Sequence, residues 1–145
     1  MPFRNFLNGN KVVKLLDNAA SATSDVTSGI VDTAGYEGAV IFTSLGTANA
    51  TNTMKVQQNT ANQTTGMADL TGTSITSGSS DEDLIVNIHQ PLERYLQVVV
   101  ARGVATAVGD IWCVLYGAKE SKLTANSVSG TQIAELHVSP AEGTA

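Results

Sequence analysis

Short runs in which apolar and polar residues alternate are the feature that most constrains the fold of this chain. Successive side chains of a β-strand point to opposite faces, so a period of two gives the strand one apolar face and one polar face. The clearest run places Leu84, Val86 and Ile88 on one side of a strand. Gly, Asn, Asp, Ser and Thr separate the runs, which is typical of turns. We therefore expect eight strands, at residues 11–16, 29–33, 38–45, 53–58, 67–70, 84–89, 95–102 and 110–117.

Two of these runs are apolar on both faces. Residues 40–42 and 98–100 have no polar member, so their strands are expected to be central, with the second face covered by a loop, an arm or another subunit. The run that ends at His89 is followed by a turn at Pro91 and then by the run in which Leu96, Val98 and Val100 face the core. Eight short strands spaced by about ten residues predict an all-β fold, an antiparallel two-sheet sandwich of jelly-roll or Greek-key type.

The length of 145 residues fits one domain. We assign residues 11–118 to the sandwich, residues 1–10 to an extended N-terminal arm and residues 119–145 to an extended C-terminal arm. Residues 17–25, which contain three alanines, are the one place where a helical turn is expected.

Apolar residues in both arms need a surface to pack against. That surface is either their own domain or a neighbouring subunit, since arms of homo-oligomers often exchange. The candidate contact residues are Phe3, Phe6 and Leu7 in the N-terminal arm and Ile133, Leu136 and Val138 in the C-terminal arm.

The charge pattern bears on the possible partners. Charged residues make up only 14% of the chain, the net charge is −5, and the eight Lys and Arg residues are scattered. Phosphate-backbone binding needs clustered positive charge, so we expect no nucleic-acid partner. No apolar stretch approaches the roughly 18 residues that cross a bilayer, and no secretory signal is visible, so we expect no membrane association and synthesis in a cytoplasm.

Few residues offer catalytic or metal-binding chemistry. The single cysteine, Cys113, lies inside an apolar run and is expected to be a buried thiol, and the two histidines, His89 and His137, lie far apart in sequence. The acidic run at residues 81–83 lacks the alternating spacing of a calcium loop and is expected to be a solvated turn. Signatures of metallohydrolases, serine hydrolases and phosphate loops are missing. We expect neither an enzyme nor a bound metal or cofactor.

Three aromatic residues form a candidate interface. Trp112 and Tyr116 share one face of their strand, and Tyr95 is expected to join them from a neighbouring strand. An exposed aromatic platform would indicate sugar binding, whereas a covered one would belong to the core or to a subunit contact, which we favour.

Several motifs in chain order give the chain a family resemblance. Over residues 11–145 it resembles a family of small proteins encoded in the structural gene cluster of tailed phages and prophages. The motifs are Gly35-Tyr36-Glu37-Gly38, Lys55-Val56-Gln57-Gln58, the stretch from Pro91 to Gly103, and Tyr116-Gly117-Ala118-Lys119. The resemblance implies a virion component without catalytic residues, most like a head decoration (cement) protein.

We therefore expect a decoration protein that stabilises the head shell by binding across capsomers on its outer surface. Its partners would be the major capsid protein and further copies of itself, as a homotrimer or homodimer. A neck, tail or fibre-associated virion protein is the alternative that the sequence leaves open. A carbohydrate-binding module that uses Trp112 and Tyr116 for host adsorption is a third hypothesis.

Overall fold

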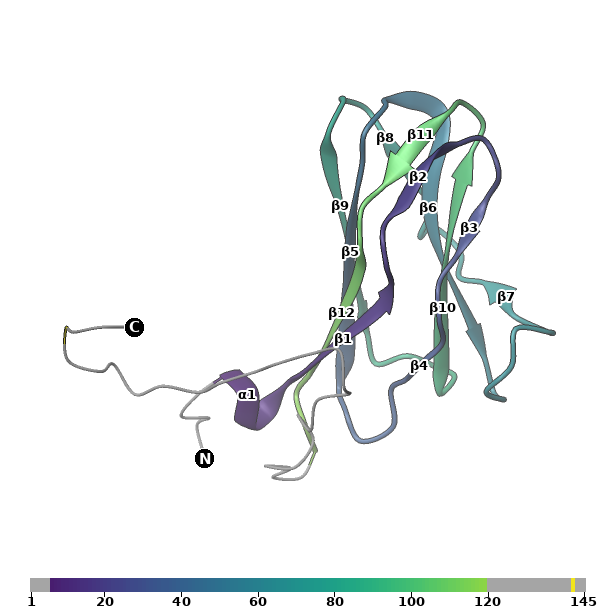
Figure 1. Ribbon diagram of the computed structural model, residues 1–145. Helices are drawn as coiled ribbons and strands as arrows, with labels where there is room; N and C mark the ends of the chain where they lie inside the picture. The colour runs from purple at the N-terminus through teal and green to yellow at the C-terminus, as the bar shows by residue number, and fades with distance from the viewer. Residues whose placement is uncertain (1–5, 120–141, 143–145) are drawn as a thin grey trace.

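The structure, a computed structural model, describes residues 6–119 and residue 142. These residues form two antiparallel β-sheets and one short helix, α1 (Phe6–Gly9) (Figure 1). The prediction of a nearly all-β fold is confirmed. The strands are β1 (Lys11–Leu16), β2 (Ala19–Ala22), β3 (Val26–Thr27), β4 (Val31–Asp32), β5 (Gly38–Leu45), β6 (Asn49–Asn59), β7 (Ala68–Asp69), β8 (Ile75–Ser77), β9 (Glu82–His89), β10 (Tyr95–Arg102), β11 (Thr106–Val108) and β12 (Ile111–Tyr116).

Each sheet is four strands wide, because several of its strands are interrupted. Sheet I has β1 and β2 at one edge, then β12 with β11, then β5, and β9 at the other edge. Sheet II has β3 and β4 at one edge, then β10, then β6, and β7 with β8 at the other edge. The strands β5 and β10 are internal in their sheets, as the fully apolar runs predicted.

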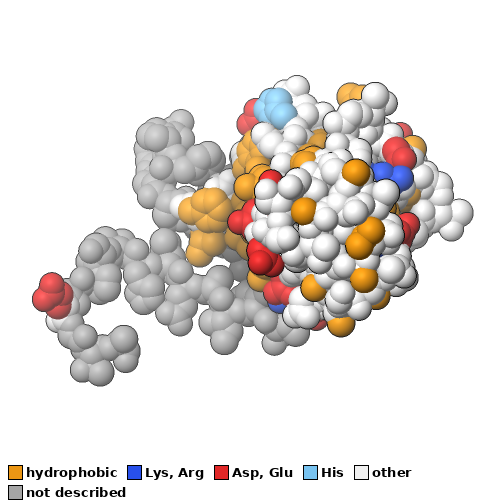
Figure 2. Space-filling view, turned by 90° about the horizontal axis from the view of Figure 1, so that it is seen from above, with side chains coloured by type: hydrophobic (Ala, Val, Ile, Leu, Met, Phe, Trp, Pro, Cys, Tyr) orange, Lys and Arg blue, Asp and Glu red, His pale blue; other side chains and the backbone are white. Residues whose placement is uncertain are grey.

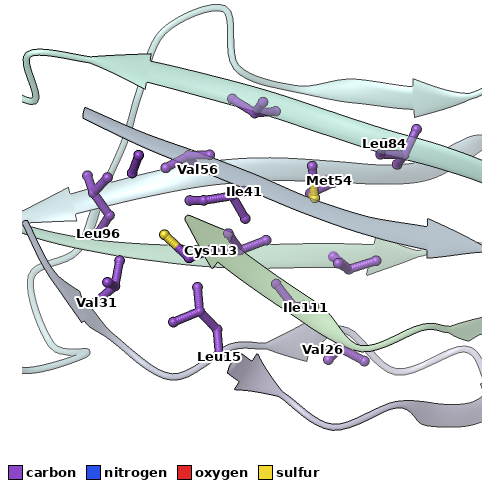
Figure 3. Packing of buried hydrophobic residues seen from close by; sticks show 14 of the residues in the cluster. Leu15, Val26, Val31, Ile41, Met54, Val56, Leu84, Leu96, Ile111 and Cys113 are labelled. Carbon is purple, nitrogen blue, oxygen red and sulfur yellow. The ribbon is translucent and has the colours of Figure 1, made fainter. Parts of the chain in front are cut away.

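The alternating residues of the sequence line the space between the sheets. Along β12, for example, Ile111, Cys113 and Leu115 are buried and the residues between them are half-buried. Figure 3 shows side chains of both sheets meeting in this core. The core members are Leu15, Ala39, Ile41, Leu45, Leu84, Val86, Val108, Ile111, Cys113 and Leu115 from sheet I and Val26, Val31, Met54, Val56, Leu96, Val98 and Val100 from sheet II, with Tyr36 from the loop before β5.

One expectation about local structure is wrong. The helical turn predicted for residues 17–25 is instead occupied largely by β2, which pairs with β11 through Ala22 and Ala19. The alanines favour a helix, but two interactions outweigh this propensity. They are the pairing of β2 with β11 and the hydrogen bond from the Asn18 N–H to the Asp110 carboxylate (2.7 Å). The turn predicted at Pro91 connects the two sheets, because β9 pairs with β5 in sheet I and β10 pairs with β6 in sheet II.

The ends of the described segment are joined at one end of the sandwich. The Ala118 N–H donates to the Gly9 carbonyl (3.0 Å), and the Lys119 N–H donates to the Gly35 carbonyl (2.9 Å). Gly9 and Ala118, which precede and follow the sandwich strands in the chain, are therefore adjacent in space.

In residues 6–119, none of the helical segments has the length and hydropathy that a membrane-spanning helix requires.

Candidate functional site

The outward face of sheet I carries an unusual row of apolar side chains. Cross-strand partners lie on the same face of a sheet, and Trp112 on β12 is opposite Phe42 on β5, which is opposite Ile85 on β9. The next level aligns Val114 with Val40 in the same way. Ile85 is 62% exposed, and the others are half-buried against one another. We call this surface the sheet I face; its members are Val12, Val40, Phe42, Ile85, Trp112 and Val114.

The outward face of sheet II differs, because ion pairs and amides dominate it. The Lys55 ammonium lies 2.7 Å from the Asp69 carboxylate, which also accepts a bond from the Gln57 amide (2.7 Å). The Arg94 guanidinium makes a two-pronged pair with Asp32 at 2.8 and 2.7 Å. Such groups are well solvated without a partner. Of the two outer faces, the sheet I face therefore has more to gain from being covered.

Charged side chains border the sheet I face beside Trp112. The Lys14 ammonium lies 4.9 Å from the centroid of the indole ring and pairs with Asp110 (3.0 Å) and Asp17 (3.2 Å). The hydrogen bond from Lys14 lowers the pKa of the Asp110 carboxyl, and the same bond raises the pKa of Lys14. The indole thus has a cation on one side and remains partly exposed.

A polar cluster lies at the other end of the same face. The Tyr116 hydroxyl donates to the Asn87 amide oxygen (2.8 Å) and lies 3.2 Å from Nδ1 of His89. The Tyr116 and His89 rings are nearly parallel, with centroids 6.3 Å apart, and Nε2 of His89 is 3.6 Å from the Glu37 carboxylate. These groups are solvent-accessible and can offer directional hydrogen bonds to a partner that covers the apolar row.

The structure gives a position to some of the candidate contact residues selected from the sequence. Trp112 and Tyr116 share one face of their strand, as predicted, and this face points outward. Tyr95 does not join them: it lies on β10 in sheet II, opposite Asn59, because β10 and β12 are not neighbours. In α1, Phe6 is 54% exposed and Leu7 is half-buried. The other candidate contacts lie outside the described residues; they are Phe3, Ile133, Leu136 and Val138.

The cluster around Tyr116 was missed by sequence reasoning. The outward position of His89 follows from the alternation in its strand, but its contact with Tyr116 joins residues 27 positions apart. Glu37 and Asn87 carry no local motif that marks them. Strand pairing alone brings these residues together.

Other groups that could carry chemistry are held in structural roles. The Glu82 carboxylate accepts the backbone N–H groups of Gly78 and Ser79 (3.1 Å for Ser79), so it closes the turn before β9. No group of three or more His, Cys, Asp or Glu side chains in the described part of the chain could hold a metal ion. An open pocket near the start of β5 is lined by Thr33, Ala34, Gly35, Tyr36, Glu37, Gln90, Pro91, Arg94 and Lys119.

The chain matches no protein-family model and no curated protein.

Proposed function

We propose that this chain is a structural protein of a tailed-phage virion, a head decoration protein that stabilises the shell by binding across capsomers. The observation that carries the proposal is the sheet I face, an apolar and aromatic surface on a body whose other outer face is polar. Large side chains that remain partly exposed in the isolated chain are the kind that anchor protein interfaces. The motif resemblance supplies the identity of the partner, the major capsid protein.

We further propose that the two sheets form a jelly roll. The chain begins in sheet I with β1 and β2, crosses to sheet II for β3 and β4, and returns to sheet I for β5. It then crosses to sheet II for β6, β7 and β8, to sheet I for β9, to sheet II for β10, and ends in sheet I with β11 and β12. This order of crossings and the two four-strand layers support a pair of Greek keys. Jelly rolls are used by viral capsid proteins and by lectins, so the fold agrees with the proposal by analogy alone.

The terminal segments are the proposed clamps. Residues 1–10 and 119–145 would reach adjacent subunits while the sandwich supplies a rigid body, and many weak contacts acting together would give the affinity. The parts of these segments nearest the sandwich, Phe6–Gly9 and Lys119, lie at the same end of it. Both segments can therefore engage one neighbour.

The surface chemistry supports a position on the outside of the head. Figure 2 shows a surface composed mostly of uncharged side chains and backbone, with acidic groups at several separate places on the face that is seen. A net charge of −5 disfavours contact with packaged DNA. The proposed location is the outer head surface, after synthesis in the host cytoplasm.

A pair of aromatic substitutions tests the proposed surface. Trp112 and Tyr95 are both half-exposed, but they lie in different sheets. Each ring has a cation over it: Lys14 lies 4.9 Å from the centroid of the Trp112 ring, and Arg94 lies 5.2 Å from the centroid of the Tyr95 ring. Purified chain would be titrated onto heads prepared without it. Trp112→Ala should weaken binding about 30-fold, the loss expected at an interface hot spot. Tyr95→Ala should bind like the wild type.

Equal binding by wild type and Trp112→Ala would refute the role of the sheet I face. Truncation of residues 1–7, or of residues 125–145, should also weaken binding while the isolated fold persists. Truncated chains that saturate heads with full affinity would refute the clamps.

A carbohydrate-binding function is the second candidate, and one observation favours it. Trp112 is not buried, and Glu37, Asn87 and His89 offer hydrogen bonds on the same outward face. Aromatic rings with adjacent polar groups suit sugar recognition. Binding to immobilised glycans that disappears in Trp112→Ala would favour this function over capsid binding.

A further inference from the structure

The four sheet edges of the molecule are not equally protected. An exposed edge strand offers unpaired N–H and C=O groups to any other strand, and proteins block such edges with short strands, bulges, lysines or prolines. In sheet II, β3, β4 and β7 have two residues each and β8 has three. In sheet I, β1 carries Lys11, Lys14 and a register shift between Lys14 and Leu16. Three of the four edges are therefore blocked.

The fourth edge, β9, is protected only by the acidic side chains of Glu82 and Asp83 at its start. Its eight residues pair with β5 at every position without a register shift, and its sequence contains no lysine or proline. Among the described residues, β9 pairs with no strand other than β5, and Figure 1 shows it at the outer margin of sheet I. This edge is long, regular and apolar at Ile85, which is the pattern expected of a strand that pairs with another chain.

The backbone groups of alternate β9 residues point to the open side. The Ser44 carbonyl accepts the Gly109 N–H (2.9 Å), so Ser44 directs its backbone groups towards β11 and β12, away from β9. Directions alternate along a strand, so Phe42 does the same. Their partners on β9, Asp83 and Ile85, then form non-hydrogen-bonded pairs with β5 and direct their own N–H and C=O groups outward.

We propose that β9 pairs with β9 of a second copy, antiparallel and across a two-fold axis, to join two sheets I into one continuous sheet. The two copies then present the same strand to each other, which closes the assembly as a dimer. Parallel pairing would place the acidic starts of the two strands side by side, whereas antiparallel pairing separates them. The inference takes the self-association in the proposed function as its starting point, but it needs no capsid.

Hydrogen-bonding complementarity and side-chain direction select one register. Directly opposite residues must share a face, and the outward residues of β9 are Asp83, Ile85, Asn87 and His89. With Val86 on the two-fold axis, Asp83 lies opposite the partner's His89, and Ile85 lies opposite the partner's Asn87. In a register shifted by two residues in either direction, Asp83 would no longer lie opposite the partner's His89. Both side chains are exposed, and the partner's Asp83 would approach a His89 ring that already contacts Tyr116 and Glu37 within its own copy.

A pair of lysine substitutions tests the edge. Sedimentation equilibrium and native mass spectrometry of the full chain should show a dimer that dissociates on dilution. Ile85→Lys, at a 62% exposed position, should give a monomer with an unchanged circular dichroism spectrum. Ala68→Lys, on the exposed edge strand β7, should remain dimeric. A monomeric wild type at high concentration, or a dimeric Ile85→Lys, would overturn the inference.

Disulfide cross-linking tests the register. Hydrogen-bonded antiparallel partners have Cα atoms about 5.5 Å apart, within disulfide range. The double variant Asp83→Cys, His89→Cys should form a covalent dimer on mild oxidation. Asp83→Cys alone should not, because the two introduced thiols would be separated by about 20 Å, the length of six strand residues.

Dimers that fail to cross-link in the double variant, or that cross-link equally through the single one, would reject this register. Asp83→Lys also places a lysine on the β9 edge, but at an exposed residue outside the sheet I face. Capsid binding that is lost in Trp112→Ala but retained by an Asp83→Lys monomer would leave the proposed function standing without the dimer.

Discussion

The phenol ring of Tyr116 lies over Gly38, its cross-strand partner, and occupies the space where a side chain of residue 38 would be. A Cβ added at Gly38 would overlap the Tyr116 ring and approach the Ile88 carbonyl oxygen to 2.7 Å. The glycine therefore allows Tyr116 to reach His89 and Asn87. The polar end of the sheet I face depends on this close approach.

We expect Gly38→Ala to lower the free energy of unfolding by about 1–3 kcal/mol, the usual cost of inserting a methyl group into a packed site. Gly78→Ala is the matched control, because the nearest atom to its Cβ would be a Glu82 carboxylate oxygen at 3.7 Å. Urea denaturation of both variants measures the difference. A Gly38→Ala protein as stable as the wild type would show that the ring moves aside without cost.

Arg102 is expected to be the most sensitive arginine. It is 5% exposed, and its guanidinium donates to the backbone carbonyls of Ser24, Ala20 (2.8 Å) and Thr106 (3.0 Å). Arg102→Met leaves these acceptors without their donor and should cost at least about 2 kcal/mol of unfolding free energy. Arg94→Met removes only an exposed pair and should cost less than about 1 kcal/mol. Similar losses in the two variants would contradict this account.

Acid should destabilise the fold through Asp32. The hydrogen bond from Arg94 holds the pKa of Asp32 below its ordinary value of 3.8. A carboxyl whose pKa is lowered by folding contributes stability above its ordinary pKa, and this stability is lost as the pH falls through the folded value. The melting temperature should therefore decrease as the pH is lowered below about 4. This decrease should be smaller in Asp32→Asn than in the wild type. Parallel acid curves for the two proteins would exclude the contribution of this pair.

The thiol of Cys113 should be inert in the folded protein. Its side chain is completely buried in the core, and burial raises the pKa of the thiol to about 12. A thiol reagent at pH 8 should therefore label the wild type only as denaturant unfolds it. Ser79→Cys, at an exposed turn position, should label one thiol at once and the other on unfolding. Rapid labelling of the native wild type would contradict the packing described here.

Strands with strong alternation were predictable, and short polar strands were not. The bounds expected for Lys11–Leu16, Gly38–Leu45 and Tyr95–Arg102 are confirmed. The strands β2, β3, β8 and β11 were missed because small residues and threonines give them no apolar period. The longer strands β10, β6 and β5 hold β3, β8 and β11 extended, and β2 pairs with β11. Periodicity reports how a strand meets the core, so strands without a core-facing pattern are invisible to it.

The pairing of strands could not be predicted from the sequence either. The alternation placed Trp112 and Tyr116 on one face of their strand, as the structure confirms, but it could not tell that this face is outward or that Tyr95 belongs to the other sheet. The apolar runs indicated a covered second face, yet the row of Trp112, Phe42 and Ile85 is set by the register of three strands. Long-range pairing decides which outward residues meet, and no local pattern encodes it.

The number of copies in purified particles is the most direct test of the proposed function. Particles from the host that encodes the chain would be purified, and the chain would be quantified by mass spectrometry against the major capsid protein. A head decoration protein should be present on the order of hundreds of copies per particle, in the head fraction. About three to twelve copies would assign the chain to the neck or tail instead, and its absence from particles would contradict a virion role altogether.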